Sequence, residues 1–131
     1  MWLSTLSVAQ RQALLGLAHN VIVSDGLLDP NEEGMLDDFK REMDLHPSRE
    51  AEYLELSGIE DVFSSRRSRI VALLNLLRLS YADGAFEIEE ECVLREISRA
   101  FHIPDAEFML LDNWVRRHLA LEEEARALMG P

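Results

Sequence analysis

The sequence predicts an all-α protein. Apolar residues recur at helical spacing along most of the chain, and no alternating apolar run is long enough to form a β-strand. The 131 residues are 47% hydrophobic and 29% charged, a composition typical of a globular domain with its own core. No low-complexity linker divides the chain, so we expect one helical domain over residues 1–131.

Two helices are predicted in the first third of the chain. Ser7 opens a capping box ahead of the first helix. Asp25-Gly26 ends this helix, because glycine readily adopts the left-handed backbone that a helix end requires. Asp29 then provides the N-cap of a second helix, with Pro30 at its first position, and His46-Pro47 ends it.

The remaining sequence predicts five more helices. A short one covers residues 51–56 and runs to Gly58. Ser65 begins a longer helix whose residues 70–79 are apolar on nearly every face, which predicts a central position in the fold. Asp83-Gly84 ends that helix, and the next one runs to Pro104. Apolar stripes in residues 108–115 and 121–128 predict the last two, so we expect about seven helices in total.

The balance of charge narrows the classes of partner. The formal net charge is −12, which repels nucleic acid and anionic lipid headgroups and favours cations or basic proteins. Two basic runs, at residues 66–69 and 116–118, interrupt this acidic surface. We expect both to be solvated helix faces, with docking to an acidic partner as the alternative.

Cysteine usage and hydropathy indicate the compartment. The single cysteine, Cys92, excludes an intrachain disulfide and is expected to be a small packed side chain. The start of the chain lacks the basic region and cleavage site of a signal peptide. No apolar stretch is long enough to span a bilayer. We therefore expect a cytoplasmic protein that does not insert directly into membranes.

A duplicated acidic turn is the most informative feature of the sequence. Residues 25–45 align with residues 83–103 at an offset of 58 positions, with six identities and further conservative pairs. This similarity indicates an internal repeat, which we place at about residues 13–58 and 71–116. Two helical halves of this kind usually pack about a pseudo-twofold axis, and such packing would bring the two acidic turns close together.

The acidic turns have two interpretations. In the first, their carboxylates cap the following helices, each at a gain of about 0.5–2 kcal/mol. In the second, they converge on a hard divalent cation such as Ca²⁺, Mg²⁺ or Mn²⁺. An EF-hand is excluded, because Leu27 and Pro30 stand where that loop needs a ligand and a glycine. The candidate metal ligands are Asp25, Asp29, Glu32, Asp83, Glu87 and Glu90.

The two turns also resemble those of a known family. The segments DGLLDPNE, at residues 25–32, and ADGAFEIEEE, at residues 82–91, resemble TerB-like domains. These include bacterial tellurite-resistance TerB proteins and the related domain of membrane-anchored DnaJ-type co-chaperones. The similarity spans roughly residues 8–115. Ser24 departs from the alanine that usually precedes the Asp-Gly pair.

The resemblance implies an all-α fold of about seven helices with a divalent-metal site near the acidic turns. By position in the motif, its ligands would include Asp25, Glu32, Asp83 and Glu90. The resemblance also implies a role in a stress-response complex at or near the inner face of the membrane.

The function expected from the sequence is therefore that of a non-enzymatic module. It would bind a divalent cation through the acidic turns and act through protein partners, some of them membrane-associated, in stress or tellurite resistance. The alternative is a pure interaction domain whose acidic turns are only helix caps. Metal-assisted phosphoester hydrolysis ranks below both, because the sequence has no nucleophile signature and no phosphate loop.

Overall fold

The first half of the chain follows the predicted capping signals. The computed structural model describes residues 1–24, 26, 29–82 and 87–130. After a short 3-10 helix, η1 (Leu3–Thr5), Ser7 caps α1 (Val8–Val23), and its hydroxyl and amide bond reciprocally with Gln10. Asp29 caps α2 (Pro30–Glu42). Both helices therefore begin where the sequence predicts them.

The second half of the chain contains the other four described α-helices. A single turn, α3 (Ile59–Val62), precedes α4 (Arg66–Ser80), and the Ser65 hydroxyl caps α4 by accepting from the Ser68 amide at 3.1 Å. The helices α5 (Ile88–Ala100) and α6 (Asp105–Met129) complete the chain. In the residues that the structure describes, no helix is both long and apolar enough to cross a membrane.

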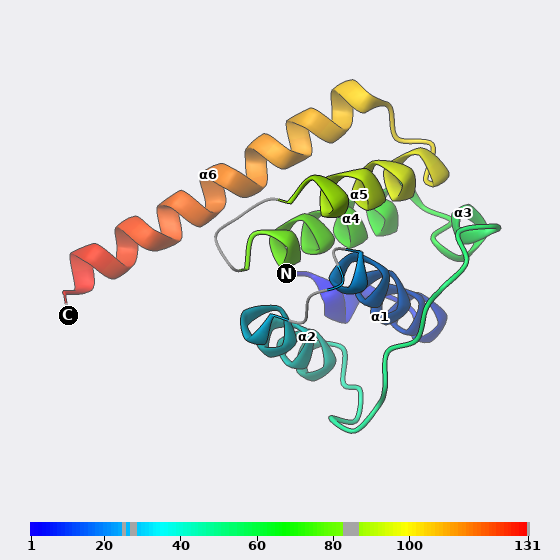
Figure 1. Cartoon of the computed structure of the whole chain (residues 1–131), viewed down its shortest axis with the longest axis horizontal. Coiled ribbons are helices and arrows are strands. Elements are labelled where there is room, and N and C mark those ends of the chain that lie inside the picture. Colours follow the sequence, from blue (N-terminus) through cyan, green and yellow to red (C-terminus); the bar gives the residue numbers. More distant parts are fainter. Residues whose placement is uncertain (25, 27–28, 83–86, 131) are drawn as a thin grey trace.

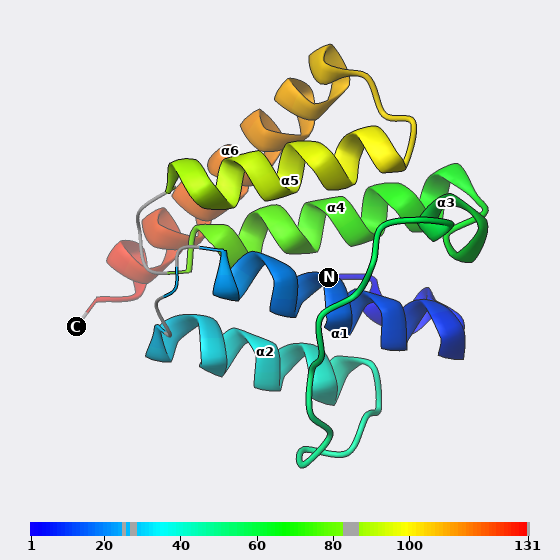
Figure 2. The same ribbon diagram turned by 45° about the vertical axis from the view of Figure 1, so that its right-hand side comes forward.

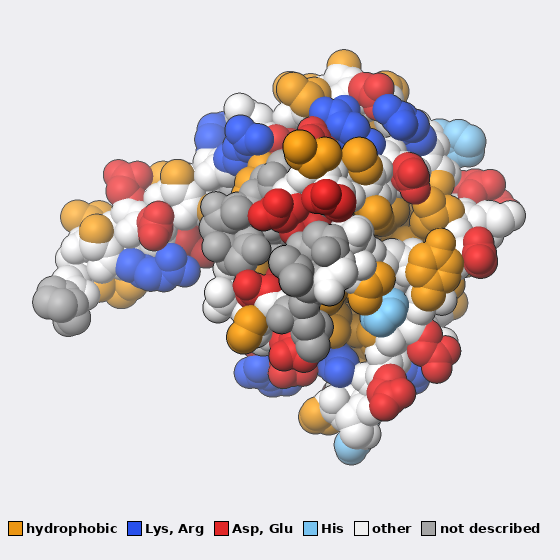
Figure 3. Space-filling model, viewed as in Figure 1, with side chains coloured by type: hydrophobic (Ala, Val, Ile, Leu, Met, Phe, Trp, Pro, Cys, Tyr) orange, Lys and Arg blue, Asp and Glu red, His pale blue; other side chains and the backbone are white. Residues whose placement is uncertain are grey.

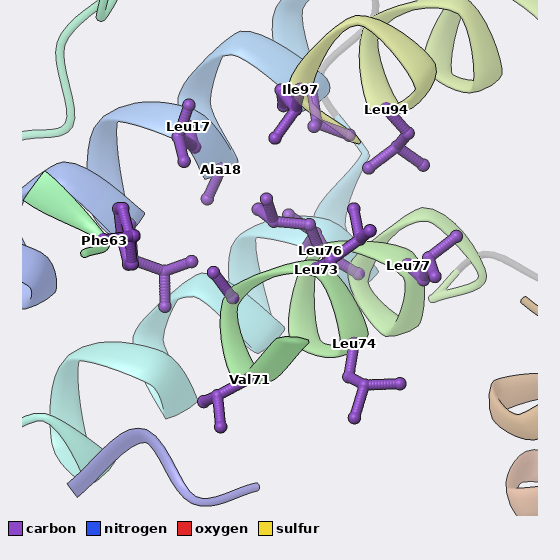
Figure 4. Close-up of a cluster of buried hydrophobic side chains, with 14 of the residues drawn as sticks. Leu17, Ala18, Phe63, Val71, Leu73, Leu74, Leu76, Leu77, Leu94 and Ile97 are labelled. Atoms are coloured by element: carbon purple, nitrogen blue, oxygen red, sulfur yellow. The ribbon is translucent and has the colours of Figure 1, made fainter. Parts of the chain in front are cut away.

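The helix α4 is central, as its apolar sequence predicts. It packs against α1, α2, α5 and α6, and it lies between α1 and α5 in Figure 2. Leu73 and Leu76 of α4 are fully buried, with Leu17 of α1 and Leu94 and Ile97 of α5 around them (Figure 4). The C-terminal part of α6 projects away from the other helices (Figure 1).

The predicted set of about seven helices differs from the structure in three places. Residues 51–56 are extended, with Leu54 and Leu56 turned inward and Tyr53 and Glu55 exposed, because the buried side chain of Asn20 holds Leu54 from α1. The two predicted C-terminal helices are one continuous helix, α6, because no glycine or proline interrupts residues 105–129. The sequence also did not predict the single turn α3, and with it the described residues form six α-helices and one 3-10 helix, without a β-strand.

The helices α2 and α5 have the same length and end in the same way. Their bounds differ by 58 positions at both ends. Each is followed by a non-glycine residue with a left-handed backbone, Asp44 (φ 58°) and His102 (φ 60°). The amides of Leu45 and Ile103 then bond to carbonyls five residues back, at 2.8 and 2.9 Å. Both helices therefore end in a Schellman motif.

Two arginines separated by the same offset hold these helix ends. Arg11 of α1 donates to the carbonyl of Met43 at 2.7 Å, and Arg69 of α4 donates to the carbonyl of Phe101 at 3.1 Å. Arg69 also donates to the carbonyls of Glu60 and Phe63. The prediction of a solvated basic face at residues 66–69 is therefore wrong for Arg69, which ties α3 and the end of α5 to α4.

Candidate functional site

The candidate site lies where α1 meets α2 and where α4 meets α5. We call residues 24–32 the first corner and residues 82–90 the second corner. The end of α1 and the start of α2 lie at the same end of the bundle as the end of α4 and the start of α5 (Figure 2). The sequence prediction that the two corners are near each other depends on this arrangement.

The described parts of the two corners are neighbours. Ser24, after the last residue of α1, lines a hollow together with Ile88 and Glu89 at the start of α5. Ala82, after α4, lines a second hollow together with Pro30 and Asn31 at the start of α2. The end of α1 thus lies beside the start of α5, and the end of α4 lies beside the start of α2.

Two of the predicted site residues are buried. Glu32 is 2% exposed and Glu90 is 1% exposed, and each is the third residue of its helix. The adjacent Glu33 and Glu89 are exposed, and Figure 3 shows acidic side chains over the start of α5. Removing a carboxylate from water is costly, so these two positions differ in kind from ordinary acidic residues in a first helical turn.

The two N-cap positions behave differently. The Asp29 carboxylate accepts from the amides of Asn31 and Glu32 at 2.7 and 3.4 Å, which confirms its predicted capping role. Glu87 is exposed and makes no side-chain capping bond, so the predicted weak cap at that position is wrong. The longer glutamate side chain fits this geometry less well than that of aspartate, serine or asparagine.

Asp25 and Asp83 lie outside the described residues. Within the part of the chain that the structure describes, no three or more His, Cys, Asp or Glu side chains are grouped closely enough to hold a metal ion. The four described candidates, Asp29, Glu32, Glu87 and Glu90, are all oxygen donors, the ligand type that Ca²⁺ and Mg²⁺ prefer. Their chemistry fits a hard divalent cation and does not fit a thiolate- or imidazole-type metal site.

A polar cluster beside the second corner was missed by the sequence analysis. The Tyr81 hydroxyl donates to Asp112 at 2.7 Å and accepts from Arg116 at 2.8 Å, which links the end of α4 to α6. Burial, with the hydrogen bond to Asp112, raises the pKa of Tyr81 to about 12. Asp112 and Arg116 are one helical turn apart on α6, and that spacing is the only sequence signal for the cluster.

Cys92 is exposed and lines the first hollow, so the prediction of a packed thiol is wrong. Leu94 and Ile97 of α5 are fully buried and mark the face of this helix that packs on the core. Cys92 lies two residues before Leu94 and therefore about 200° around the helix from it, on the outer surface.

Comparison with known proteins assigns part of the chain to a family. Residues 51–113 match the family model described as tellurite resistance protein TerB. The match includes the second corner and leaves the first outside, so it is shorter than the span of residues 8–115 expected from the motifs. No curated protein and no solved structure matches the chain. TerB is a family of non-catalytic domains. This match covers just under half of the chain, and together with the all-helical fold of the described residues it is consistent with a TerB-like domain.

Proposed function

We propose that this protein is a non-enzymatic TerB-like module in which the two acidic corners together bind a divalent cation. The observation that carries the proposal is the burial of Glu32 and Glu90, 58 positions apart, in the first turns of α2 and α5. A bound cation would offset the cost of holding two carboxylates away from water. The net charge of −12 would add to its attraction.

We also propose that the two halves are a structural repeat within one TerB-like domain that covers residues 1–131. Three features support this proposal. The bounds of α2 and α5 are 58 positions apart at both ends, and both helices end in a Schellman motif. Ser7 and Ser65, also 58 positions apart, cap α1 and α4. The reciprocal neighbours at the corners also support it. In a repeat of this kind the two corners would contribute equivalent ligands to one site.

The ligand set that we assign comes from both corners. Because the Asp29 carboxylate already caps α2, it would serve as a shared or peripheral ligand. A cation held between the corners would supply positive charge and would link two helix starts that belong to different halves of the chain. The full set of assigned ligands is Asp25, Asp29, Glu32, Asp83, Glu87 and Glu90.

In the cell, such a module would act through contacts with other proteins. Its family points to a role in tellurite resistance or a related bacterial stress response. We propose a cytoplasmic location with protein partners, some of them at the membrane, and without nucleic acid as a ligand. The acidic charge supports the last point, because it repels phosphate backbones.

The decisive experiment measures cation binding and stability together. Ca²⁺, Mg²⁺ and Mn²⁺ are titrated into the purified protein by calorimetry, and thermal unfolding is followed with and without each metal. A ligand that binds only the native state, at a concentration about 100 times its Kd, stabilises the protein by about 2.7 kcal/mol. We expect such a shift for the native sequence and its loss in the double variant Glu32→Gln/Glu90→Gln.

A matched control is available one residue along each helix. Glu33 and Glu91 have the same 58-residue offset and the same charge, and they are more exposed than Glu32 and Glu90. The double variant Glu33→Gln/Glu91→Gln should retain the metal-dependent shift in melting temperature. Absence of heat and of any melting shift at millimolar metal in the native protein would contradict cation binding.

The second candidate function is a pure interaction domain whose acidic corners only cap helices. The hydrogen bonds from the amides of Asn31 and Glu32 to Asp29 favour it. This alternative predicts that Glu32→Gln/Glu90→Gln folds normally and that no metal changes the melting temperature of either protein. It also predicts that Asp29→Ala destabilises the protein by about 1 kcal/mol with or without metal.

A further inference from the structure

A groove beside the corners exposes several apolar side chains together. Its walls come from the end of α1, the start of α5 and the extended segment of residues 51–56, and its volume is about 420 Å³. Val23, Tyr53 and Ile88 line it and are 45%, 65% and 74% exposed. Clusters of exposed apolar side chains of this kind mark sites where another molecule binds. We call this hollow the corner groove.

The rim of the corner groove is acidic. Glu89 and Glu96 of α5 line it, and none of its described lining residues is a lysine or arginine. Neither glutamate forms an ion pair in the part of the chain that the structure describes. In a protein of net charge −12, this rim disfavours an acidic partner and favours a cationic one. An apolar floor with an acidic rim fits a segment that carries both apolar and basic side chains.

In the second half, the residue that corresponds to Val23 is contacted by a helix. Tyr81 and Ala82 stand 58 positions after Val23 and Ser24, and they line a hollow whose other walls come from α2 and α6. There Arg116 of α6 donates to the Tyr81 hydroxyl and lies 5.7 Å from the centre of its ring. No described helix covers the corner groove in the same way, since its third wall is the extended segment of residues 51–56.

We propose that the corner groove binds an amphipathic helix of a partner protein, with large apolar side chains on one face and lysine or arginine beside them. The apolar face packs on Val23, Tyr53 and Ile88, and the basic residues lie against Glu89 and Glu96. This inference rests on the protein-contact part of the proposed function and is independent of cation binding at the corners.

The partner chemistry is tested by selection from a random peptide library displayed on phage, with the full chain as the target. We expect the selected peptides to combine large apolar residues at helical spacing with lysine or arginine. A dye-labelled peptide from this selection is then titrated by fluorescence anisotropy against the native protein and its variants. Because part of the attraction is electrostatic, its affinity should fall as salt concentration rises.

The variants separate the groove from the rest of the surface. Ile88→Ser/Tyr53→Ser removes apolar contacts and should weaken binding by at least about tenfold. Glu89→Lys/Glu96→Lys should weaken it by about tenfold as well. Val8→Ser is the matched control, because Val8 is also an exposed β-branched first residue of a helix, 68% exposed, and it does not line the groove. Its binding should be unchanged.

Three results would overturn the proposal. They are failure to select any peptide, selection of acidic or purely polar peptides, and equal binding to the native protein and Ile88→Ser/Tyr53→Ser. Self-association of the native chain that the same variant abolishes, measured by sedimentation velocity, would instead assign the groove to a second copy. Peptide binding by Glu32→Gln/Glu90→Gln, with and without metal, separates failure of the groove from failure of the cation site.

Discussion

The substitution Gly16→Ala tests whether α1 positions the extended segment of residues 51–56. Gly16 is buried within α1, and a Cβ atom built there lies 2.8 Å from the Cβ of Leu54 and 3.2 Å from the carbonyl oxygen of Glu52. Ordinary carbon–carbon contacts are about 3.5–4.0 Å, so the segment must move by more than about half an ångström. This movement displaces Leu54, whose backbone N–H and C=O are both hydrogen-bonded to the side-chain amide of Asn20.

The change in the free energy of unfolding expected for Gly16→Ala is the difference between two opposing effects. Alanine favours the helical state over glycine by about 1 kcal/mol. Against this, displacement of the segment stretches the Asn20–Leu54 bonds of 2.7 and 3.0 Å, each worth about 1 kcal/mol, and leaves a nearly buried amide poorly bonded at a further cost of about 1–3 kcal/mol. We expect Gly16→Ala to lower the free energy of unfolding by about 1–3 kcal/mol.

Gly34→Ala provides the matched control, measured with Gly16→Ala by urea unfolding. Gly34 lies in the exposed face of α2, and a Cβ atom there meets no other atom within 4 Å. It should therefore show only the helical preference, a gain of about 1 kcal/mol. Equal stabilisation by the two substitutions would refute the packing of residues 51–56 on α1.

Three other predictions concern the caps, the helix ends and the second corner. Ser7→Ala and Ser65→Ala should each lower the free energy of unfolding by about 1 kcal/mol in urea titrations, because each hydroxyl caps a helix; changes near zero would contradict this. Arg69→Met should cost about 3 kcal/mol in the same assay, because three carbonyls lose a charged donor; a cost like that of an exposed residue would contradict the contacts. The pKa of Tyr81 is raised from 10.0 to about 12, so the folded state holds its proton where the unfolded state loses it, and stability should fall as pH rises through this window. Tyr81→Phe should remove that slope and the late phase of the tyrosinate absorbance titration; an unchanged late phase would contradict the assignment.

The features that were predictable from sequence are those that local residues determine. Ser7 and Asp29 are good N-caps wherever they stand, and the structure places α1 and α2 directly after them. The central position of α4 follows from a helix without a polar face. Glu32 and Glu90 were singled out by their repeated spacing, but their burial depends on neighbouring helices that the pattern does not specify.

The features that were missed depend on residues far apart in the chain. Leu54 is held by Asn20, which precedes it by 34 residues, so the apolar stripe at residues 51–56 predicts a helix that does not form. Arg69 looked like a surface arginine, yet one of its three carbonyl partners lies 32 residues away. The hydroxyl of Tyr81 meets Asp112 and Arg116 only because α6 crosses the end of α4.

The contacts between helices have a consequence for how the chain folds. The helix α1 packs against α4 and α5 as well as against its neighbour α2, so the buried side chains of the two halves form one cluster. A fragment ending near Gly58 would leave the inner face of α1 in water, and a fragment beginning there would do the same for α4. Neither fragment has a complete interior, so we expect the whole chain to unfold in a single cooperative step and the separated halves to fold only when mixed.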